Sequence, residues 1–201
     1  ICSATNEDIE ATADCLRALG AVIHKNENGY LVKPITSLPE SAVLNCRESG
    51  STLRFLLPVV GALGVDATFL LSGRLPSRPL SPLWEEMQRM GCQLSRPTET
   101  SLRCTGQLRS GSYSIDGSVS SQFVSGLLFA AALLPEKTAV NITGRVESKP
   151  YIQMTLDALT AFGVICEKNT VDVTYPFLSP GEIAVEGDWS NAAFFLTANA
   201  L

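Results

Sequence analysis

The sequence is poor in residues that hold metals, because it has a single histidine and no CxxC pair among its six cysteines. Structural zinc sites need several closely spaced cysteines and histidines, so we expect no metal. We instead expect buried or half-buried free thiols in a reducing cytosol. Cys92 and Cys104 could nevertheless face each other across a hairpin.

Long apolar runs and an excess of basic charge are also absent. The longest apolar stretch, residues 123–134, is interrupted by Ser125 and Gly126 and is too short to cross a bilayer. No signal peptide is visible, so we expect a cytoplasmic protein without a membrane partner. The net charge of −5 argues against a nucleic-acid partner.

The chain has no linker or low-complexity tract, and 45% of its 201 residues are hydrophobic, which is enough for a substantial core. Ile1 is not an initiator methionine, and the chain stops at Leu201 inside an apolar run typical of an unfinished helix. We therefore expect a part of a longer protein.

An internal repeat organises the sequence. Three amphipathic helical patterns each end in a glycine and are followed by two short alternating strands. The helical patterns cover residues 9–20, 83–91 and 152–163. Their terminal glycines, Gly20, Gly91 and Gly163, are spaced by 71 and 72 residues. This spacing indicates a repeated supersecondary unit.

A second series of residues has nearly the same period. Ser49, Ser120 and Ser190 are spaced by 71 and 70 residues, and each precedes the pattern of an almost wholly apolar helix. Strands are predicted after the first two of these inner helices, at residues 67–71 and 139–143. The fold class is therefore α/β, with mixed sheets and outer helices packed around buried inner helices.

The N-termini of the inner helices are predicted to converge, where free N–H groups and helix dipoles would suit phosphate or carboxylate. The first of these turns contains Gly50, which allows close backbone approach, and Arg54 follows one turn into the helix. Arg78 places a second guanidinium near another predicted helix start. Taken singly, an ordinary N-cap and a surface salt bridge would also explain these residues.

Two further turns carry more polar groups than a cap requires. Residues 118–122 offer three hydroxyls and an amide ahead of an apolar helix, although a plain N-cap needs one such side chain. Ser148, Lys149 and Tyr151 lie just ahead of the last predicted outer helix. Because these groups fall at equivalent joints of a repeated unit, we predict one shared anion site rather than unrelated caps.

Five segments together resemble the 5-enolpyruvylshikimate-3-phosphate (EPSP) synthase family in order and approximate spacing. They are residues 49–54, 78–80, 117–123, 148–152 and 186–188, so the resemblance spans nearly the whole chain. The Ser-Ser-Gln and Ser-Lys-Pro-Tyr elements favour this family over its relative, UDP-N-acetylglucosamine enolpyruvyl transferase, which is one alternative. An anion-binding domain without catalysis is another.

The resemblance implies a two-lobed enolpyruvyl transferase-like fold, in which each lobe has three βαβαββ units and the active site lies between the lobes. Residues 1–181 would form most of the N-terminal lobe, which binds shikimate 3-phosphate. Residues 182–201 would form the hinge and the start of the second lobe. Phe55 departs from the pattern, since many family members have proline there. Inhibitor sensitivity is therefore not carried over.

The resemblance also implies the reaction and its ligands. The enolpyruvyl group of phosphoenolpyruvate would pass to the 5-hydroxyl of shikimate 3-phosphate, with release of phosphate. No metal or organic cofactor is implied, and the full-length enzyme is expected to be a monomer. The residues implied to bind shikimate 3-phosphate are Ser120, Ser121, Gln122, Ser148 and Tyr151. Those implied to shape the phosphoenolpyruvate site are Gly50, Arg78 and Gln122, with Arg54 and Lys149 in support.

No catalytic residue is assigned within the chain. By the same resemblance, the family's lysine-serine-arginine element would precede Ile1, and its catalytic aspartate, glutamate and lysine would follow Leu201. The chain alone is therefore expected to be inactive.

Overall fold

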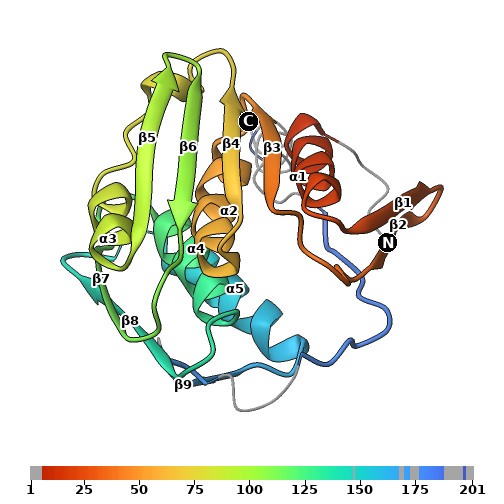
Figure 1. The fold of residues 1–201 in the computed structure, drawn as a ribbon. Helices are drawn as coiled ribbons and strands as arrows, with labels where there is room; N and C mark the ends of the chain where they lie inside the picture. Colours follow the sequence, from red (N-terminus) through yellow and green to blue (C-terminus); the bar gives the residue numbers. More distant parts are fainter. Residues whose placement is uncertain (1–5, 147, 168–169, 173–176, 188–196, 198–201) are drawn as a thin grey trace.

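The computed structural model describes residues 6–146, 148–167, 170–172, 177–187 and 197. It has an α/β fold in which helices pack against mixed β-sheets (Figure 1). The helices are α1 (Glu7–Ala18), α2 (Gly50–Leu63), α3 (Leu83–Arg89), α4 (Ser121–Ala131) and α5 (Lys149–Ala161), with a short 3-10 helix η1 (Leu75–Ser77). The strands are β1 (Val22–Asn26), β2 (Gly29–Lys33), β3 (Ser41–Arg47), β4 (Asp66–Leu71), β5 (Cys92–Thr98), β6 (Ser101–Gly106), β7 (Ser112–Asp116), β8 (Thr138–Thr143), β9 (Ile165–Glu167) and β10 (Thr170–Asp172).

The two four-stranded sheets have one topology. Their strand orders are β3-β4-β6-β5 and β7-β8-β10-β9. In each sheet the first two strands are parallel and the other pairings are antiparallel. Residues 41–106 and 112–172 therefore each form a βαβαββ unit, which we call the first and second complete units. The predicted repeat is confirmed for both.

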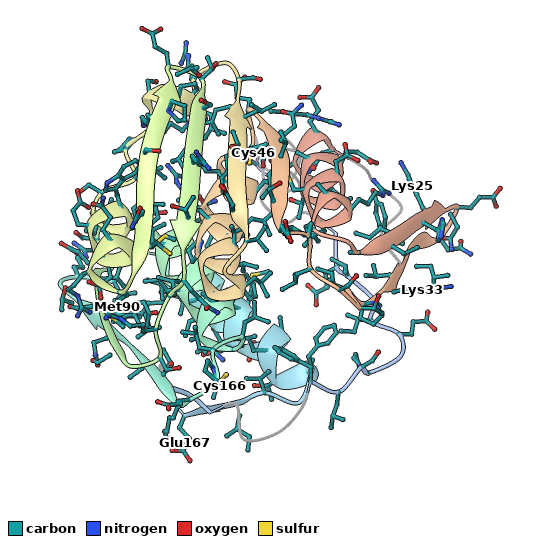
Figure 2. All side chains as sticks on the ribbon, viewed as in Figure 1. Lys25, Lys33, Cys46, Met90, Cys166 and Glu167 are labelled. Carbon is teal, nitrogen blue, oxygen red and sulfur yellow. The ribbon has the colours of Figure 1, made fainter. Side chains whose placement is uncertain are left out.

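The segment before the first complete unit has the second half of the same design, a helix followed by a hairpin. Helix α1 precedes the hairpin β1–β2, which lies at the edge of the molecule in Figure 1. Lys25 and Lys33 lie on this hairpin (Figure 2), and Lys25 Nζ is 3.1 Å from Glu10 Oε1 of α1. Among the described residues, β1 and β2 pair only with each other.

Helices α2 and α4 are the predicted inner helices, and both begin where the serine pattern placed them. Ser49 caps α2 by accepting the N–H of Thr52, and Ser120 caps α4 by accepting the N–H of Gln122. Most residues of both helices are buried, as expected for helices that are apolar nearly all round. The third predicted inner helix, after Ser190, lies outside the described residues.

The two inner helices are in close contact at Gly126 of α4. A Cβ at this position would collide with the carbonyl oxygen of Arg54 and lie 3.2 Å from Cγ of Pro58. Pro58 lies inside α2 and has no N–H to give the Arg54 carbonyl, which is its usual helical partner. Glycine therefore permits a helix contact that joins the two complete units.

The outer helices end as predicted. Gly20, Gly91 and Gly163 have φ angles of 103°, 121° and 80°, which a glycine adopts without the steric cost borne by other residues. The start of the last outer helix was predicted wrongly. Helix α5 begins at Lys149, not after Tyr151, because Pro150 fits the first helical turn.

The expected free thiols are confirmed for the described cysteines. Cys15, Cys46, Cys92 and Cys104 are buried, Cys166 is half-buried, and all five are free. Hydrogen bonding to Cys92 and burial raise the pKa of Cys104. Among the described residues, no helix is long and apolar enough to span a membrane. The same residues contain no group of three or more His, Cys, Asp or Glu placed to hold a metal ion.

Candidate functional site

The topology puts the predicted polar turns at the carboxyl ends of parallel strands. Helix α2 follows β3, and the segment that carries Arg78 follows β4, which runs parallel to β3. Helices α4 and α5 follow the parallel strands β7 and β8 in the same way. Within each complete unit, the two chain segments that follow the parallel strands therefore start from the same edge of the sheet.

Gly50 lies beside two guanidinium groups. A Cβ on Gly50 would be 2.8 Å from Nη1 of Arg78 and 3.5 Å from Nη1 of Arg54. Any larger residue would therefore displace one arginine or both. The first turn of α2 thus offers backbone N–H groups and two guanidinium groups within a small volume.

Arg54 links the two complete units. Its Nη1 donates a hydrogen bond of 2.7 Å to Oε1 of Gln122, which lies in the first turn of α4. The guanidinium carbon also lies 5.5 Å from the centroid of the Phe123 ring, a distance suited to a cation–π contact. The first turns of the two inner helices therefore meet at one arginine, which confirms the predicted convergence for α2 and α4.

The electrostatics of the arginine pair leave positive charge unbalanced. Burial, and then the neighbouring charge of Arg78, lower the pKa of Arg54. Among the described residues, neither arginine forms a salt bridge with a carboxylate. In addition, Nε of Arg54 is buried and has no hydrogen-bond partner in that part of the chain. An anion between the two guanidinium groups would relieve this repulsion.

The second complete unit contributes hydroxyls, an amide, a phenol and the ammonium group of Lys149. Ser120 and Ser121 are half-buried at the start of α4, where Ser120 Oγ lies 3.2 Å from the N of Gln122. Ser148, Lys149 and Tyr151 are exposed at the start of α5. Helix α5, which these three residues begin, lies beside α4. A hydrogen bond of 2.7 Å joins Ser125 of α4 to Thr155 of α5.

Ser148 has an unusual backbone. Its φ of 55° and ψ of 43° put a serine in the left-handed region, and its side chain makes no cap hydrogen bond. Non-glycine residues in this region are strained, and such strain is frequent at ligand sites. The Ser148 hydroxyl is therefore not used to cap α5, unlike that of Ser49 in α2.

The sequence interpretation missed Glu48. Its Oε1 accepts a 3.0 Å hydrogen bond from the N–H of Arg74, and its carboxylate packs against Gly73. Glu48 thus fixes the loop that leads to Arg78. The available signal was an acidic residue directly before the Ser49 cap, but its partner lies 26 residues further along the chain.

Arg78 and Ser49 each line a surface cavity. Arg78 lines a groove of about 710 Å³ together with Trp84 and Arg96, and Ser49 lines a hollow of about 360 Å³ together with Arg47. Gly50 itself is buried and lines neither of these cavities.

A family model and the curated relatives that match this chain carry the same enzyme name. Residues 4–201 match the sequence model of the family described as EPSP synthase (3-phosphoshikimate 1-carboxyvinyltransferase). The chain is 38% identical to a 3-phosphoshikimate 1-carboxyvinyltransferase of Clostridium kluyveri over 98% of its length, which is 47% of that relative. It is 37% identical to the enzyme of the same name from Clostridium perfringens, again over 98% of the chain and 48% of the relative.

The fold of this chain is also similar to that of a solved structure with the same enzyme name. The EPSP synthase of Acinetobacter baumannii superposes with a TM-score of 0.72 at 26% identity, over 96% of this chain and 45% of that one. The chain thus spans about half the length of the curated relatives it matches.

Proposed function

The chain belongs to the EPSP synthase family, and from this membership we propose that its full-length protein transfers the enolpyruvyl group of phosphoenolpyruvate to shikimate 3-phosphate. The 5-hydroxyl of shikimate 3-phosphate accepts the group and inorganic phosphate is released. The reaction belongs to the shikimate pathway, which supplies the aromatic amino acids.

The observation that carries this proposal is the arginine pair at Gly50. The two guanidinium groups share no carboxylate partner among the described residues, so they give the site an unbalanced positive charge, and Arg78 offers paired donors for the carboxylate or phosphate of phosphoenolpyruvate. Gly50, Arg78 and Gln122 form the phosphoenolpyruvate side of the site in this proposal. Arg54 supports them through its hydrogen bond to Gln122.

The shikimate 3-phosphate side is assigned to the second complete unit. Ser120 and Ser148 bind the phosphate, with Lys149 as a supporting charge. Ser121 and Gln122 contact the substrate. A hydroxyl that is not used as a cap, as in Ser148, supports this assignment because it remains available to a ligand.

Tyr151 lines the ring of the substrate. It lies in the first turn of α5 and is 53% exposed, so one face of the phenol is accessible.

In the chemical step, the methylene carbon of phosphoenolpyruvate is protonated and the 5-hydroxyl adds to the cationic centre with loss of its own proton. Phosphate then leaves, and loss of a proton from the new methyl group restores the double bond. The residues of this chain bind and orient the two anions, which lowers the entropic cost of bringing them together. The proton-transfer groups are assigned to parts of the protein outside this chain, so the chain alone is inactive.

The domain division follows the same proposal. Residues 1–181 form most of the N-terminal lobe, and residues 182–201 form the hinge and the beginning of the second lobe. Residues 188–196 and 198–201 of that second segment lie outside the described part of the chain. We assign the protein to the cytoplasm, where phosphorylated metabolites are made, and expect a monomer.

Release of inorganic phosphate tests the proposal. Full-length protein supplied with shikimate 3-phosphate and phosphoenolpyruvate should release phosphate, and residues 1–201 alone should release none. UDP-N-acetylglucosamine is the control acceptor, and turnover with it in place of shikimate 3-phosphate would transfer the assignment to the related enzyme. A full-length protein that binds both anions without turnover would be a non-catalytic binding domain, which would overturn the proposal.

A further inference from the structure

The hydrogen bond between Arg54 and Gln122 determines which way the Gln122 amide faces. A guanidinium has only donors, so it can be satisfied only by the carbonyl oxygen of a carboxamide. The 2.7 Å contact therefore assigns Oε1 of Gln122 to Arg54. The amide nitrogen, on the opposite side of the planar group, is left to face away from Arg54.

This orientation matters for an anion. A glutamine that is free to turn presents either a donor or an acceptor, and an acceptor beside a carboxylate or phosphate is repulsive. With its oxygen held, Gln122 offers donors only. It then matches its neighbours, because the N–H groups of the first turn of α2 and the Arg78 guanidinium are donors too.

The setting of Arg54 keeps this contact in place. The guanidinium lies over the Phe123 ring on one side and beside the space left by Gly50 on the other. Its Nε is buried without a hydrogen-bond partner among the described residues, which costs stability. An apolar side chain would fill the same space without this cost.

We propose that Arg54 is a positioning residue that holds the Gln122 amide with its NH2 group towards bound phosphoenolpyruvate. The inference rests on the proposed function and deepens it, because it assigns Arg54 an effect that passes through Gln122. A guanidinium that bound the substrate directly would act whether or not Gln122 were present.

A double-mutant cycle in the full-length protein separates the two roles. Arg54→Met raises the KM for phosphoenolpyruvate about tenfold and changes kcat less, as expected when a hydrogen bond to a charged ligand is lost. In a Gln122→Met background the same change adds only about threefold, which reflects the lost positive charge. Arg54→Lys, which keeps both a donor and the charge, recovers most of the affinity.

Two results would overturn the inference. One is an equal, multiplicative effect of Arg54→Met with and without Gln122, which would mean direct binding. The other is an Arg54→Lys variant as impaired as Arg54→Met while both keep the melting temperature of the unmodified protein. If Arg54→Met fails to fold, Arg54→Gln replaces it in the cycle.

A binding measurement distinguishes failure of this inference from failure of the proposed function. Calorimetric titration with inorganic phosphate needs no turnover, so the coupling between residues 54 and 122 can be measured even in a protein without enolpyruvyl transfer. Coupled phosphate binding without turnover would retain the positioning role and reject the reaction. Turnover with independent effects of the two residues would retain the reaction and reject the positioning role.

Discussion

The first and second complete units have the same topology but carry different chemistry. Both place a capped inner helix after the first strand of a parallel pair. The first unit contributes Gly50 and two arginines, whereas the second contributes hydroxyls, an amide, a phenol and one supporting lysine. A repeated scaffold can therefore support an asymmetric site, because the strands and buried faces set the fold while the residues at the joints remain free to differ.

Further contacts join the units outside the polar turns. Gly126 lets α4 approach α2, and Glu86 of α3 accepts the N–H of Ser114 in β7. Changes at these contacts should weaken both units together. Changes at Arg78 or at Ser148 should each affect one ligand and leave the fold intact.

The largest loss of stability is expected from Gly126→Ala. The added Cβ would collide with the Arg54 carbonyl, and overpacking of this kind costs about 3 kcal/mol. Denaturant unfolding of the full-length protein measures it. The control is Gly187→Ala, whose Cβ would have no atom of the described residues within 4 Å. Equal midpoints for the two variants would contradict the close helix contact.

Arg78→Met should separate the two ligands. Loss of a charge-assisted donor pair is expected to raise the KM for phosphoenolpyruvate about a hundredfold. Affinity for shikimate 3-phosphate, measured by calorimetry, should change by no more than about twofold. Arg96→Met, which removes an exposed arginine from the same groove, is the matched control. Equal losses of affinity for both ligands would show that the two units do not bind separate ligands.

The stability of the interface between the units should depend on pH, because the interface contains the carboxyl group of Glu86. Burial opposes its ionisation, but hydrogen bonds from Arg89 and the Ser114 N–H prevail and hold its pKa below 4.5. A carboxyl with a lowered folded pKa stabilises the protein above its unfolded pKa, and this contribution is lost as pH falls through the folded value.

Glu86→Gln should therefore lower the free energy of unfolding by about 2 kcal/mol at neutral pH. The difference from the unmodified protein should shrink in acid, below the ordinary pKa of 4.5. Urea unfolding between neutral and acidic pH measures both effects. Glu85→Gln changes an exposed neighbour on the same helix and should show neither.

The smallest expected effects on stability distinguish a serine that caps a helix from one that does not. Ser49→Ala removes a cap from the buried start of α2 and should cost about 1 kcal/mol. Ser148→Ala removes no cap hydrogen bond and should alter stability by less than about 0.5 kcal/mol, while weakening shikimate 3-phosphate binding. Thermal unfolding and calorimetry on both variants test the contrast. A larger stability loss for Ser148→Ala would make it a structural residue.

The features that sequence predicted are local. Helix ends could be predicted because Gly20 and Gly91 mark left-handed C-termini and Ser49 and Ser120 mark N-caps, and each acts within a few residues. The repeat followed because these marks recur at a fixed spacing. Burial of the inner helices followed from their apolar composition.

The features that sequence did not predict depend on distant partners. Arg54 and Gln122 were both predicted as site residues, but their contact joins positions 68 residues apart. The role of Glu48 depends on a loop in another part of the unit. Ser148 was predicted as a ligand residue, but its positive φ has no sequence signal, because serine rarely adopts that backbone.

The bridge from Arg54 to Gln122 also has a thermodynamic consequence. The proposed anion site is formed by residues of both complete units. A ligand would therefore bind there only when the two units are packed against each other. Mass action then makes the ligand a stabiliser, worth about 2.7 kcal/mol at a concentration one hundred times its Kd. The melting temperature would depend on the anions in the buffer, and phosphate would protect the protein during purification.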